Sequence, residues 1–383
     1  MIKQPMVSIL AATVLLSSVF TSPVSAKPGK DLKIIPVIVN GQKVRFPDTE
    51  PYINTDGRTM VPVRFVSEKL GAKVDWEPDT ETAVIRYGEK EIHMPVGSTM
   101  VEVNGESVEL DTAAEKYDGR TMVPLRFVSE VMASKVEWDE DAHAVKVTDT
   151  AYQAKIDAGE VTLDPWGREY SKKQDEYWMR LTDLESTKFY SFYKNSPSRA
   201  FLEPRYYDDV VVRLHSDSMA QKIRNYYEAQ LNIDYRTVDA EQFAKKFIEN
   251  SYMIDDLFRV GQQKALIKDY VAWVKKNKVI AKGYADPELS TLYRSGDLMW
   301  VPTRFKFMII SAEDTSQTFF DNYNVSEVAD SFKLKKGIWY DGYSEVSMTS
   351  NVANQAWGRY YGIRHGENMF YKNSYFYNIT TNQ

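Results

Sequence analysis

The sequence has no cysteine, only four histidines, no surplus of positive charge and no long apolar run beyond its first twenty residues. Without cysteine the chain has no disulfides, no thiol nucleophile and no cysteine-ligated zinc or iron–sulfur site. Its 48 basic and 54 acidic residues give a net charge of −6, which is unlike a protein that binds nucleic acid by bulk attraction. The 43% hydrophobic and 27% charged residues are ordinary for a globular chain. A length of 383 residues allows two or three domains.

The first 26 residues have the pattern of a secretory signal peptide. Lys3 precedes the uncharged apolar run Met6–Phe20, and small residues lead to a cleavage site after Ala26. A membrane anchor needs about 20 apolar residues, and Ser17 and Ser18 interrupt this run too early. We therefore expect an exported product, extracellular or associated with the cell wall, with no membrane span after cleavage.

The front half of the chain contains a duplicated unit. The 13-residue segment Asp56–Glu68 recurs as Asp118–Glu130, with one conservative difference and an offset of 62 residues. A shorter echo, Val-Asn-Gly, precedes the copies at residues 39–41 and 103–105. A match of this length at a fixed offset is typical of an internal repeat.

Each copy is predicted to contain a hairpin, a short strand and a helix. Asn-Gly between short apolar runs is a strong hairpin signal, because both turn residues need positive φ, and it predicts hairpins over 34–46 and 100–110. Pro62 is expected at the first helical position, where its missing N–H costs nothing. The spacing of apolar residues then predicts a helix over 63–70.

The end of the helix differs between the copies. Gly71 is expected to end the first helix in a left-handed conformation, whereas Ala133 holds the corresponding position in the second copy. Trp76 and Trp138, which follow, are expected to cover their helices. Further strands are expected at 83–86 and 144–147.

The charged residues of the repeat allow two interpretations. They are Arg58, Arg64 and Glu68 in the first copy, and Arg120, Arg126 and Glu130 in the second. Together they have the character of an anion site. Arg64 and Glu68, however, stand four residues apart on a helix, which is the spacing of an ion pair, and this structural interpretation is favoured.

These motifs identify a family resemblance. Residues from about 34 to 147 resemble the copper amine oxidase N-terminal-like domain, also called the stalk-type domain, through the doubled GRTMVP-[VL]-RFVSE motif and the Val-Asn-Gly turns. The resemblance implies a small α+β module, found on exported bacterial proteins, mostly of Gram-positive species, and regarded as a spacing or interaction unit at the cell surface. We expect this domain to occupy residues 27–149.

The family name does not imply an oxidase here. The resemblance to the catalytic enzymes would require three histidine copper ligands, two of them in His-x-His, and the four histidines of this chain are His93, His143, His215 and His365. No two of them are close in sequence, and Asn322-Tyr323-Asn324 lacks the acidic neighbour of the quinone site. We expect no metal and no cofactor.

Residues 150–383 are predicted to form a separate α+β domain that resembles no family we recognise. Residues 148–164 carry no clear period and are expected to link the two domains. Helices are expected at 170–193, 217–231, 239–248 and 254–274, the second of them capped by Ser216-Asp217. After Asp286-Pro287 the pattern alternates, and strands are expected at 298–310, 337–350 and 370–379. The fold class predicted for the whole chain is α+β.

Catalytic motifs in this second domain are weak. Arg364-His365-Gly366-Glu367 resembles the motif of histidine phosphatases, but only 17 residues follow Gly366, so a polar turn is favoured. The acidic pairs Asp208-Asp209 and Asp255-Asp256 are compatible with a carboxylate-based glycoside hydrolase, although adjacent acids more often lie in a solvated turn or helix start. The catalytic residues are unknown.

Tyrosine clusters are the stronger candidates for ligand contact. A tyrosine ring stacks on a sugar face, and neighbouring residues of a strand face opposite ways, so at least one ring of each pair is expected in the core. The candidate ligand-contact residues are Tyr206, Tyr207, Tyr360, Tyr361, Tyr375 and Tyr377.

These patterns favour a non-catalytic exported protein of the bacterial surface or cell wall. Its duplicated module would space or dock the protein, and its second domain would bind cell-wall polysaccharide or another surface protein, with no nucleic-acid partner. The alternative is a secreted carboxylate-based hydrolase, for example a glycosidase, with an unidentified active site.

Overall fold

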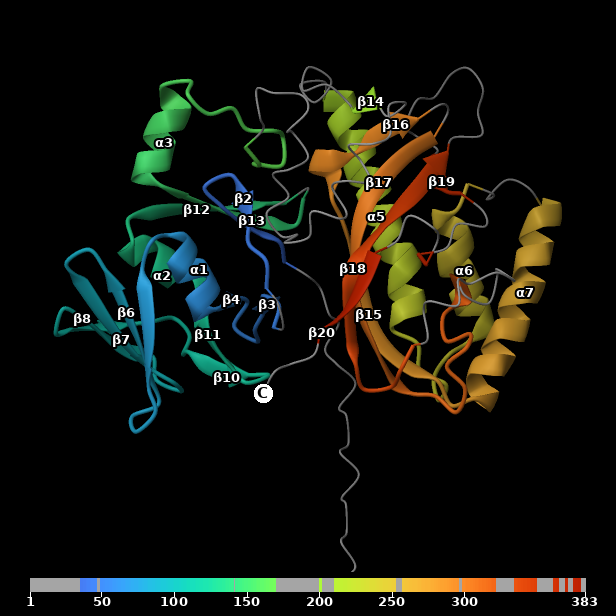
Figure 1. Cartoon of the computed structure of the whole chain (residues 1–383), viewed down its shortest axis with the longest axis horizontal. Helices are drawn as coiled ribbons and strands as arrows, with labels where there is room; N and C mark the ends of the chain where they lie inside the picture. Colours follow the sequence, from blue (N-terminus) through green and yellow to red (C-terminus); the bar gives the residue numbers. More distant parts are fainter. Residues whose placement is uncertain are drawn as a thin grey trace, which may run out of the picture. The chain divides into compact units, whose positions relative to one another are not determined.

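The computed structural model describes most of the chain from residue 35 onward (Figure 1). The described residues are 35–46, 49–140, 142–169, 200–201, 210–252, 257–295, 298–321, 334–349, 361–364, 369–370 and 375–379. Leu32–Gln383 form one compact unit. The expected signal peptide and the expected helix over 170–193 lie outside the described residues.

The two predicted Asn-Gly hairpins are confirmed. Their strands are β1 (Val37–Val39), β2 (Gln42–Lys43), β8 (Met100–Val103) and β9 (Glu106–Glu109). Asn40 and Gly41 have φ of 49° and 71°, and Asn104 and Gly105 have φ of 52° and 81°. Positive φ at both positions gives the turn a twist that matches its strands.

In each copy a short strand runs directly into a short helix. These elements are β4 (Thr59–Pro62) with α1 (Val63–Lys69), and β11 (Arg120–Pro124) with α2 (Leu125–Val131). The sequence predicts Pro62 as the first helical residue, but it is the cap that precedes the helix. Its φ is −61° and its ψ is 115°. The fixed φ of proline suits the end of the extended strand as well as a helix.

Both helices end at a residue with positive φ. Gly71 has φ of 88°, and Ala133 in the corresponding position has φ of 54°. Their amides donate to the carbonyls of Glu68 and Glu130 at 3.0 and 2.9 Å. The second copy therefore keeps the predicted cap geometry with a residue whose Cβ makes that conformation unfavourable.

Two sheets of the module each combine strands of both copies. One sheet has the order β12 (Ser134–Asp139), β13 (Ala144–Asp149), β1, β2. Another has the order β5 (Lys73–Glu77), β6 (Thr82–Tyr87), β7 (Lys90–Pro95), β8, β9. The strands that follow each helix thus share a sheet with the hairpin of the other copy.

A third sheet pairs the two copies directly. It has the order β10 (Glu115–Tyr117), β11, β4, β3 (Tyr52–Ile53). The strands β4 and β11 are antiparallel, and Val61 lies opposite Val123, which is the same position of the repeat. The copies are therefore related by a pseudo-two-fold axis at this residue pair. Both valines lie in one hydrophobic core that takes residues from both copies.

The expected irregular linker contains a helix. β13 extends to Asp149, and α3 (Thr150–Asp157) follows it. The Asp149 carboxylate accepts the amide of Tyr152 at 2.7 Å. Asp149 as an N-cap is the sequence signal for this helix, and the composition of the linker does not reveal it.

Three described helices begin the second domain. They are α5 (Val210–Leu231), α6 (Ala240–Asn250) and α7 (Leu257–Lys276). α5 starts before Ser216, so the expected cap there is wrong, and Asp217 instead accepts the indole N–H of Trp166 at 2.9 Å. Asp239, expected as the first residue of the helix over 239–248, is instead the N-cap of α6 and accepts the amide of Gln242. None of the helices among the described residues is long and apolar enough to cross a membrane.

An antiparallel sheet packs against these helices, so the α+β fold class is confirmed (Figure 1). Its strands are β14 (Ala200–Phe201), β15 (Ile280–Pro287), β16 (Tyr293–Ser295), β17 (Leu298–Ser311), β18 (Trp339–Thr349), β19 (Gly362–Ile363) and β20 (Tyr375–Ile379), with the short 3₁₀ helix η3 (Leu289–Thr291). β15 begins at Ile280 and includes Asp286-Pro287, so the change from helices to strands comes earlier than expected.

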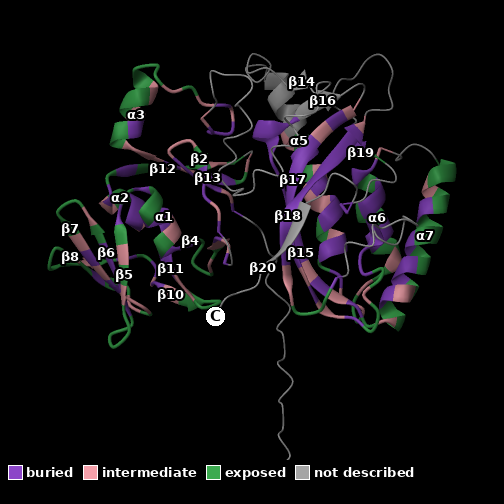
Figure 2. Cartoon of the chain, viewed as in Figure 1, coloured by how far each residue is buried: buried purple, intermediate pink, exposed green. Residues whose placement is uncertain are grey.

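The central strands of this sheet are buried on both faces (Figure 2). Phe305, Phe307 and Ile309 of β17 belong to the hydrophobic core that includes the helices. The alternating residues Arg304 and Lys306 point to the opposite face, because successive side chains of a strand alternate, and they too are buried.

Residues of the module cover this charged face. Glu50 lies 3.1 Å from the Lys306 ammonium and 3.4 Å from the Arg304 guanidinium. Arg304 also donates through Nε to Asp341 at 2.9 Å. The hydroxyl of Tyr284 donates to Glu50 at 2.6 Å, and burial raises the pKa of this phenol above its usual value.

A second group of buried ion pairs lies beside the first. Lys43 of the module pairs with Asp286 and Glu288, and Arg168 pairs with Glu288. All four side chains are buried. Charges removed from water are stable only when they are paired and hydrogen-bonded, so these pairs join the module to the sheet in one specific arrangement.

We predict that residues 27–149 fold as a unit and melt in one transition. The reason is that each half supplies strands to a sheet of the other and shares its core. The measurement is thermal unfolding of this fragment by circular dichroism, with a fragment ending at residue 96 as the control, which should stay unfolded. Two well-separated transitions would contradict the prediction.

Ala133→Gly should stabilise the protein by about 1 kcal/mol, because glycine removes the cost of a Cβ at positive φ. The matched variant Gly71→Ala should destabilise it by about 1–2 kcal/mol. Nothing lies within 4 Å of a Cβ built on Gly71, so the effect there is conformational and not steric. Urea unfolding of both variants measures it, and equal effects of the same sign would refute the explanation.

Asp164→Asn should gain stability over the unsubstituted chain as the pH rises. Burial raises the pKa of the Asp164 carboxyl, although the Ser290 hydroxyl and the amides of Arg168 and Trp166 donate to it. Ionisation of this carboxyl therefore opposes folding above its unfolded pKa of about 3.9. Asparagine keeps an acceptor oxygen without the charge.

The difference between the two proteins should be smallest near pH 4 and increase until the pH passes the raised pKa. Urea unfolding from pH 4 to pH 8 measures it. Asp239→Asn, at an exposed helix cap, is the control and should show no such gain. A difference that does not change with pH would mean that burial of the charge is not the cause.

Candidate functional site

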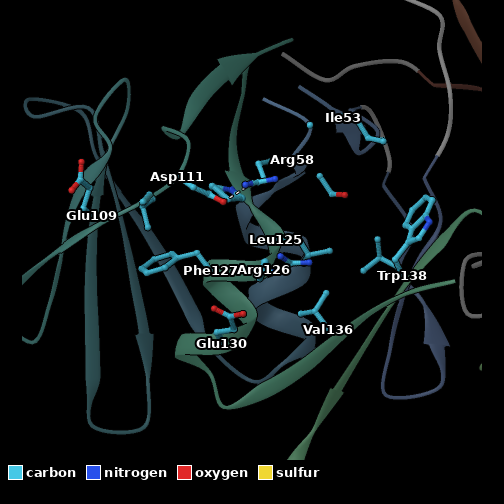
Figure 3. Close-up of a pocket in the computed structure, with 15 residues that line it drawn as sticks. Ile53, Arg58, Glu109, Asp111, Leu125, Arg126, Phe127, Glu130, Val136 and Trp138 are labelled. Carbon is cyan, nitrogen blue, oxygen red and sulfur yellow. Dashed lines mark hydrogen bonds and ion pairs between the residues drawn. The ribbon is translucent and has the colours of Figure 1, made fainter. Parts of the chain in front are cut away.

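An open groove crosses the module where the turn of one copy meets the helix of the other (Figure 3). Its volume is about 480 Å³. The first copy contributes Ile53 of β3 and the turn residue Arg58, and the second contributes α2 and β12. We call it the Trp138 groove, after the tryptophan on β12.

The groove has apolar walls with two exposed residues. Leu125 and Phe127 of α2 and Val136 of β12 line it. Trp138 is 43% exposed and Ile53 is 52% exposed. The sequence predicts that Trp138 covers its helix, but the side chain is exposed. Large apolar side chains that remain in contact with water around a concave surface are typical of interaction sites.

Charged side chains surround these apolar walls. Arg58 pairs with Asp111, and Arg126 and Glu130 project from α2 (Figure 3). Glu109 adds a further carboxylate. Two arginines and three acids around an apolar centre resemble the anatomy of protein interfaces, which have a polar rim around an apolar core.

A second groove occupies the pseudo-symmetric position. It has a volume of about 410 Å³, and is lined by α1, β5 and the turn of the second copy, with Trp76 in place of Trp138 and Phe65 in place of Phe127. We call it the Trp76 groove. Arg64, Phe65 and Trp76 here are the residues that lie 62 positions before Arg126, Phe127 and Trp138.

In the Trp76 groove, two cations of the module itself lie over the aromatic rings. The Lys116 ammonium lies 5.2 Å from the centre of the Trp76 ring, and the Arg120 guanidinium lies 5.6 Å from the centre of the Phe65 ring. Both distances are within the range of cation–π interactions. The two grooves are therefore lined by equivalent residues of the repeat but differ in the side chains that lie over their aromatic rings.

The predicted ion pair of the repeat is confirmed in the first copy. Arg64 lies 3.8 Å from Glu68, and both side chains are about half exposed. Their counterparts Arg126 and Glu130 line the Trp138 groove. The repeat's charged residues are thus brought together around the two grooves, although each groove draws its turn and its helix from different copies.

The candidate tyrosines of the second domain have varied positions. Tyr361 is only 7% exposed and belongs to the hydrophobic core. Tyr375 and Tyr377 lie on β20, opposite Tyr343 and Asp341 of β18, and their side chains are not described. Tyr206, Tyr207 and Tyr360 lie outside the described residues.

The weak catalytic motifs fall mostly in the same gaps. The acidic pairs at 208–209 and 255–256, His365 and residues 322–324 lie outside the described residues. Among the described residues, no three His, Asp or Glu side chains are placed to hold a metal ion. His93 contacts Glu91 at 2.8 Å, and the rings of His143 and Trp138 are 6.2 Å apart, edge to face.

The repeat pattern does not group Trp138, Phe127 and Ile53. The repeat shows that tryptophan and phenylalanine recur in both copies, but Ile53 has no such partner in the motif. Only the pairing of β4 with β11 brings the turn of one copy to the helix of the other. A comparison of the two copies, position by position, is the signal that would have found the residues that differ.

Comparison with known families confirms the nature of the module. Residues 38–147 match the family described as the copper amine oxidase N-terminal domain. The chain is also 27% identical over 161 residues to a protein described as "Protease inhibitor" from Brevibacillus choshinensis. This match covers 42% of the present chain and 47% of the relative, so it spans about half of the relative's length. No solved structure matches the chain. The front module thus matches the copper amine oxidase N-terminal domain family, as the repeat predicts.

Proposed function

We propose that this chain is an exported bacterial protein that acts by binding another protein at the cell surface or outside the cell, and that its duplicated module is the docking unit. The observation that carries the proposal is the Trp138 groove, in which an exposed tryptophan and an exposed isoleucine are surrounded by charged side chains. Tryptophan and arginine are the residues that most often dominate binding energies at protein interfaces.

The buried carboxylates of the chain support a binding role over a hydrolytic one. Asp286, Glu288 and Asp341 are each paired with a lysine or an arginine and closed off from solvent. A glycosidase needs two carboxyl groups that face a substrate, with one of them protonated at working pH. The present ion pairs hold the module on the sheet instead.

The similarity to a protease inhibitor supports a protein as the partner. An inhibitor acts by occupying another protein, and the relative shares 27% of residues over the matched part. We therefore place a secreted protease ahead of cell-wall polysaccharide as the partner of this chain. The exported location rests on the signal-peptide pattern of the first 26 residues.

The test is binding and inhibition with the purified chain that starts at residue 27. A panel of secreted serine and metalloproteases is assayed on casein, and binding to each protease and to purified cell wall is measured directly. We expect retention or inhibition of at least one protease, and Trp138→Ala should weaken it about tenfold or more, as is usual for a central aromatic contact.

The control variant is Phe258→Ala, which removes a 75% exposed aromatic residue on α7, outside the groove. It should bind as the unsubstituted chain does. Retention on cell wall alone would favour polysaccharide as the partner and contradict the proposed protein partner. Turnover of wall or peptide substrates by the purified chain would contradict the non-catalytic role.

A further inference from the structure

The two grooves of the module occupy equivalent positions of the repeat but differ in the side chains that lie over their aromatic rings. This difference indicates what the Trp138 groove binds. In the sheet that joins the copies, Lys116 lies opposite Thr121, and Ile53 lies opposite Thr59. Because Thr59 and Thr121 are the same position of the repeat, Ile53 stands where Lys116 stands in the other copy. The segment from Ile53 to Thr59 is one residue longer than the segment from Lys116 to Thr121. The offset of 62 residues therefore does not by itself show this equivalence.

Lys116 supplies the cation that lies over the tryptophan of the Trp76 groove. Its ammonium lies over the Trp76 ring at 5.2 Å and pairs with Glu81. The Trp76 groove therefore holds a cation between an aromatic ring and a carboxylate. Arg64 also lines the Trp76 groove. Its charge is balanced by Glu68, which lies 3.8 Å away, so it does not oppose the position of Lys116.

The Trp138 groove has the aromatic ring but not the internal cation. Ile53 carries no charge in the place of Lys116 and is 52% exposed, and Trp138 is left 43% exposed. Arg58, the counterpart of Arg120, pairs with Asp111. No lysine or arginine of the described residues is placed over Trp138 or Phe127 as Lys116 and Arg120 are placed over their counterparts.

A carboxylate is nevertheless present beside Trp138. Glu140 accepts the indole N–H of Trp138, and it occupies the position that Pro78 has in the first copy. His143 takes the position of Glu81, and the two residues share a positive φ of 51° and 49°. The acid has thus moved along the same turn by three residues, and the open groove keeps one carboxylate next to its tryptophan.

We propose that the Trp138 groove binds a lysine side chain of a partner protein, with the ammonium over the Trp138 ring, Glu140 as its counter-charge and its aliphatic stem against Ile53. The chain would thereby take from its partner the cation that Lys116 supplies in the Trp76 groove. Charge complementarity agrees with this, because the chain has a net charge of −6 and the groove lining carries three acids, Glu109, Asp111 and Glu130, against Arg58 and Arg126. Arg58 is paired to Asp111, and Glu140 lies beside the tryptophan. The inference deepens the proposed function and rests on it.

The experiment uses the full chain from residue 27 and a fluorescent decapeptide of alternating glycine and lysine. Binding is measured by fluorescence anisotropy, and stoichiometry by titration calorimetry. We expect one lysine-peptide site per chain, with no comparable binding of the acetyl-lysine peptide or of the corresponding glutamate peptide. Trp138→Ala and Glu140→Gln should each weaken binding roughly tenfold, since each removes one of the two contacts of the ammonium.

Ile53→Lys is the decisive variant. It should place an internal ammonium over Trp138 and abolish peptide binding. Because Ile53 is exposed, the substitution should leave the fold intact, and circular dichroism checks this. Lys116→Met should do the reverse, exposing Trp76 and raising the stoichiometry from one site to two. Phe258→Ala is the control and should leave affinity and stoichiometry unchanged.

The outcomes separate this inference from the proposed function. If a protease binds through Trp138 but the lysine peptide neither binds nor competes, the inference is wrong and the proposed function stands. If the peptide binds equally well to the Ile53→Lys variant, the groove is not the site and the inference is wrong. If the unsubstituted chain dimerises and Ile53→Lys makes it monomeric, the occupant is a second copy of the chain, and the inference is also wrong.

Discussion

The pairing of β4 with β11 is the contact on which the front module depends. It places Val61 opposite Val123 and so relates two similar segments by a pseudo-two-fold axis. Each helix then lies beside the turn of the other copy, and each hairpin shares a sheet with strands of the other copy. A segment of about 60 residues is near the lower limit for a stable core of its own. The exchange of strands solves this by giving both copies one core.

Duplication with exchange also explains why a binding surface arises between the copies. A groove formed by one turn and one helix occurs twice, and identical copies would give two identical grooves. Here the copies have diverged at the residue that faces the tryptophan, which is lysine in one and isoleucine in the other. In the Trp76 groove the module's own lysine lies over the tryptophan, which adds a cation–π contact and an ion pair to the fold. The Trp138 groove remains open and keeps the same aromatic surface in contact with water.

The buried ion pairs at the charged face of the sheet serve a different purpose. Arg304, Lys306 and Lys43 each meet a carboxylate, and their charges are removed from solvent. Apolar contacts would allow the module to slide on the sheet, whereas paired charges are satisfied in one register only, because an unpaired buried charge is strongly unfavourable. This face is therefore a specific joint between the two halves, and its carboxylates are engaged in holding it together.

The sequence by itself determined the local elements of the module. Asn-Gly turns require positive φ, so both hairpins were predictable, and the repeat gave two helices that end at Gly71 and Ala133. The sequence also indicated the family that residues 38–147 match and the end of α5 at Leu231. These features depend on interactions between residues close in sequence.

Tertiary structure alone decided the rest. The exchange of strands, the burial of Arg304 and Lys43, and the two grooves join residues far apart in the chain, and no local propensity encodes which of several possible strand partners a segment takes. Trp138 and Trp76 are equivalent in the sequence, but Trp138 is exposed whereas Trp76 is partly buried with Lys116 over its ring. The cause is the register of β3 and β10, which puts Ile53 in the lining of one groove and Lys116 in the lining of the other. Register is set by packing across the whole sheet, and for that reason the open groove is visible only in the folded molecule.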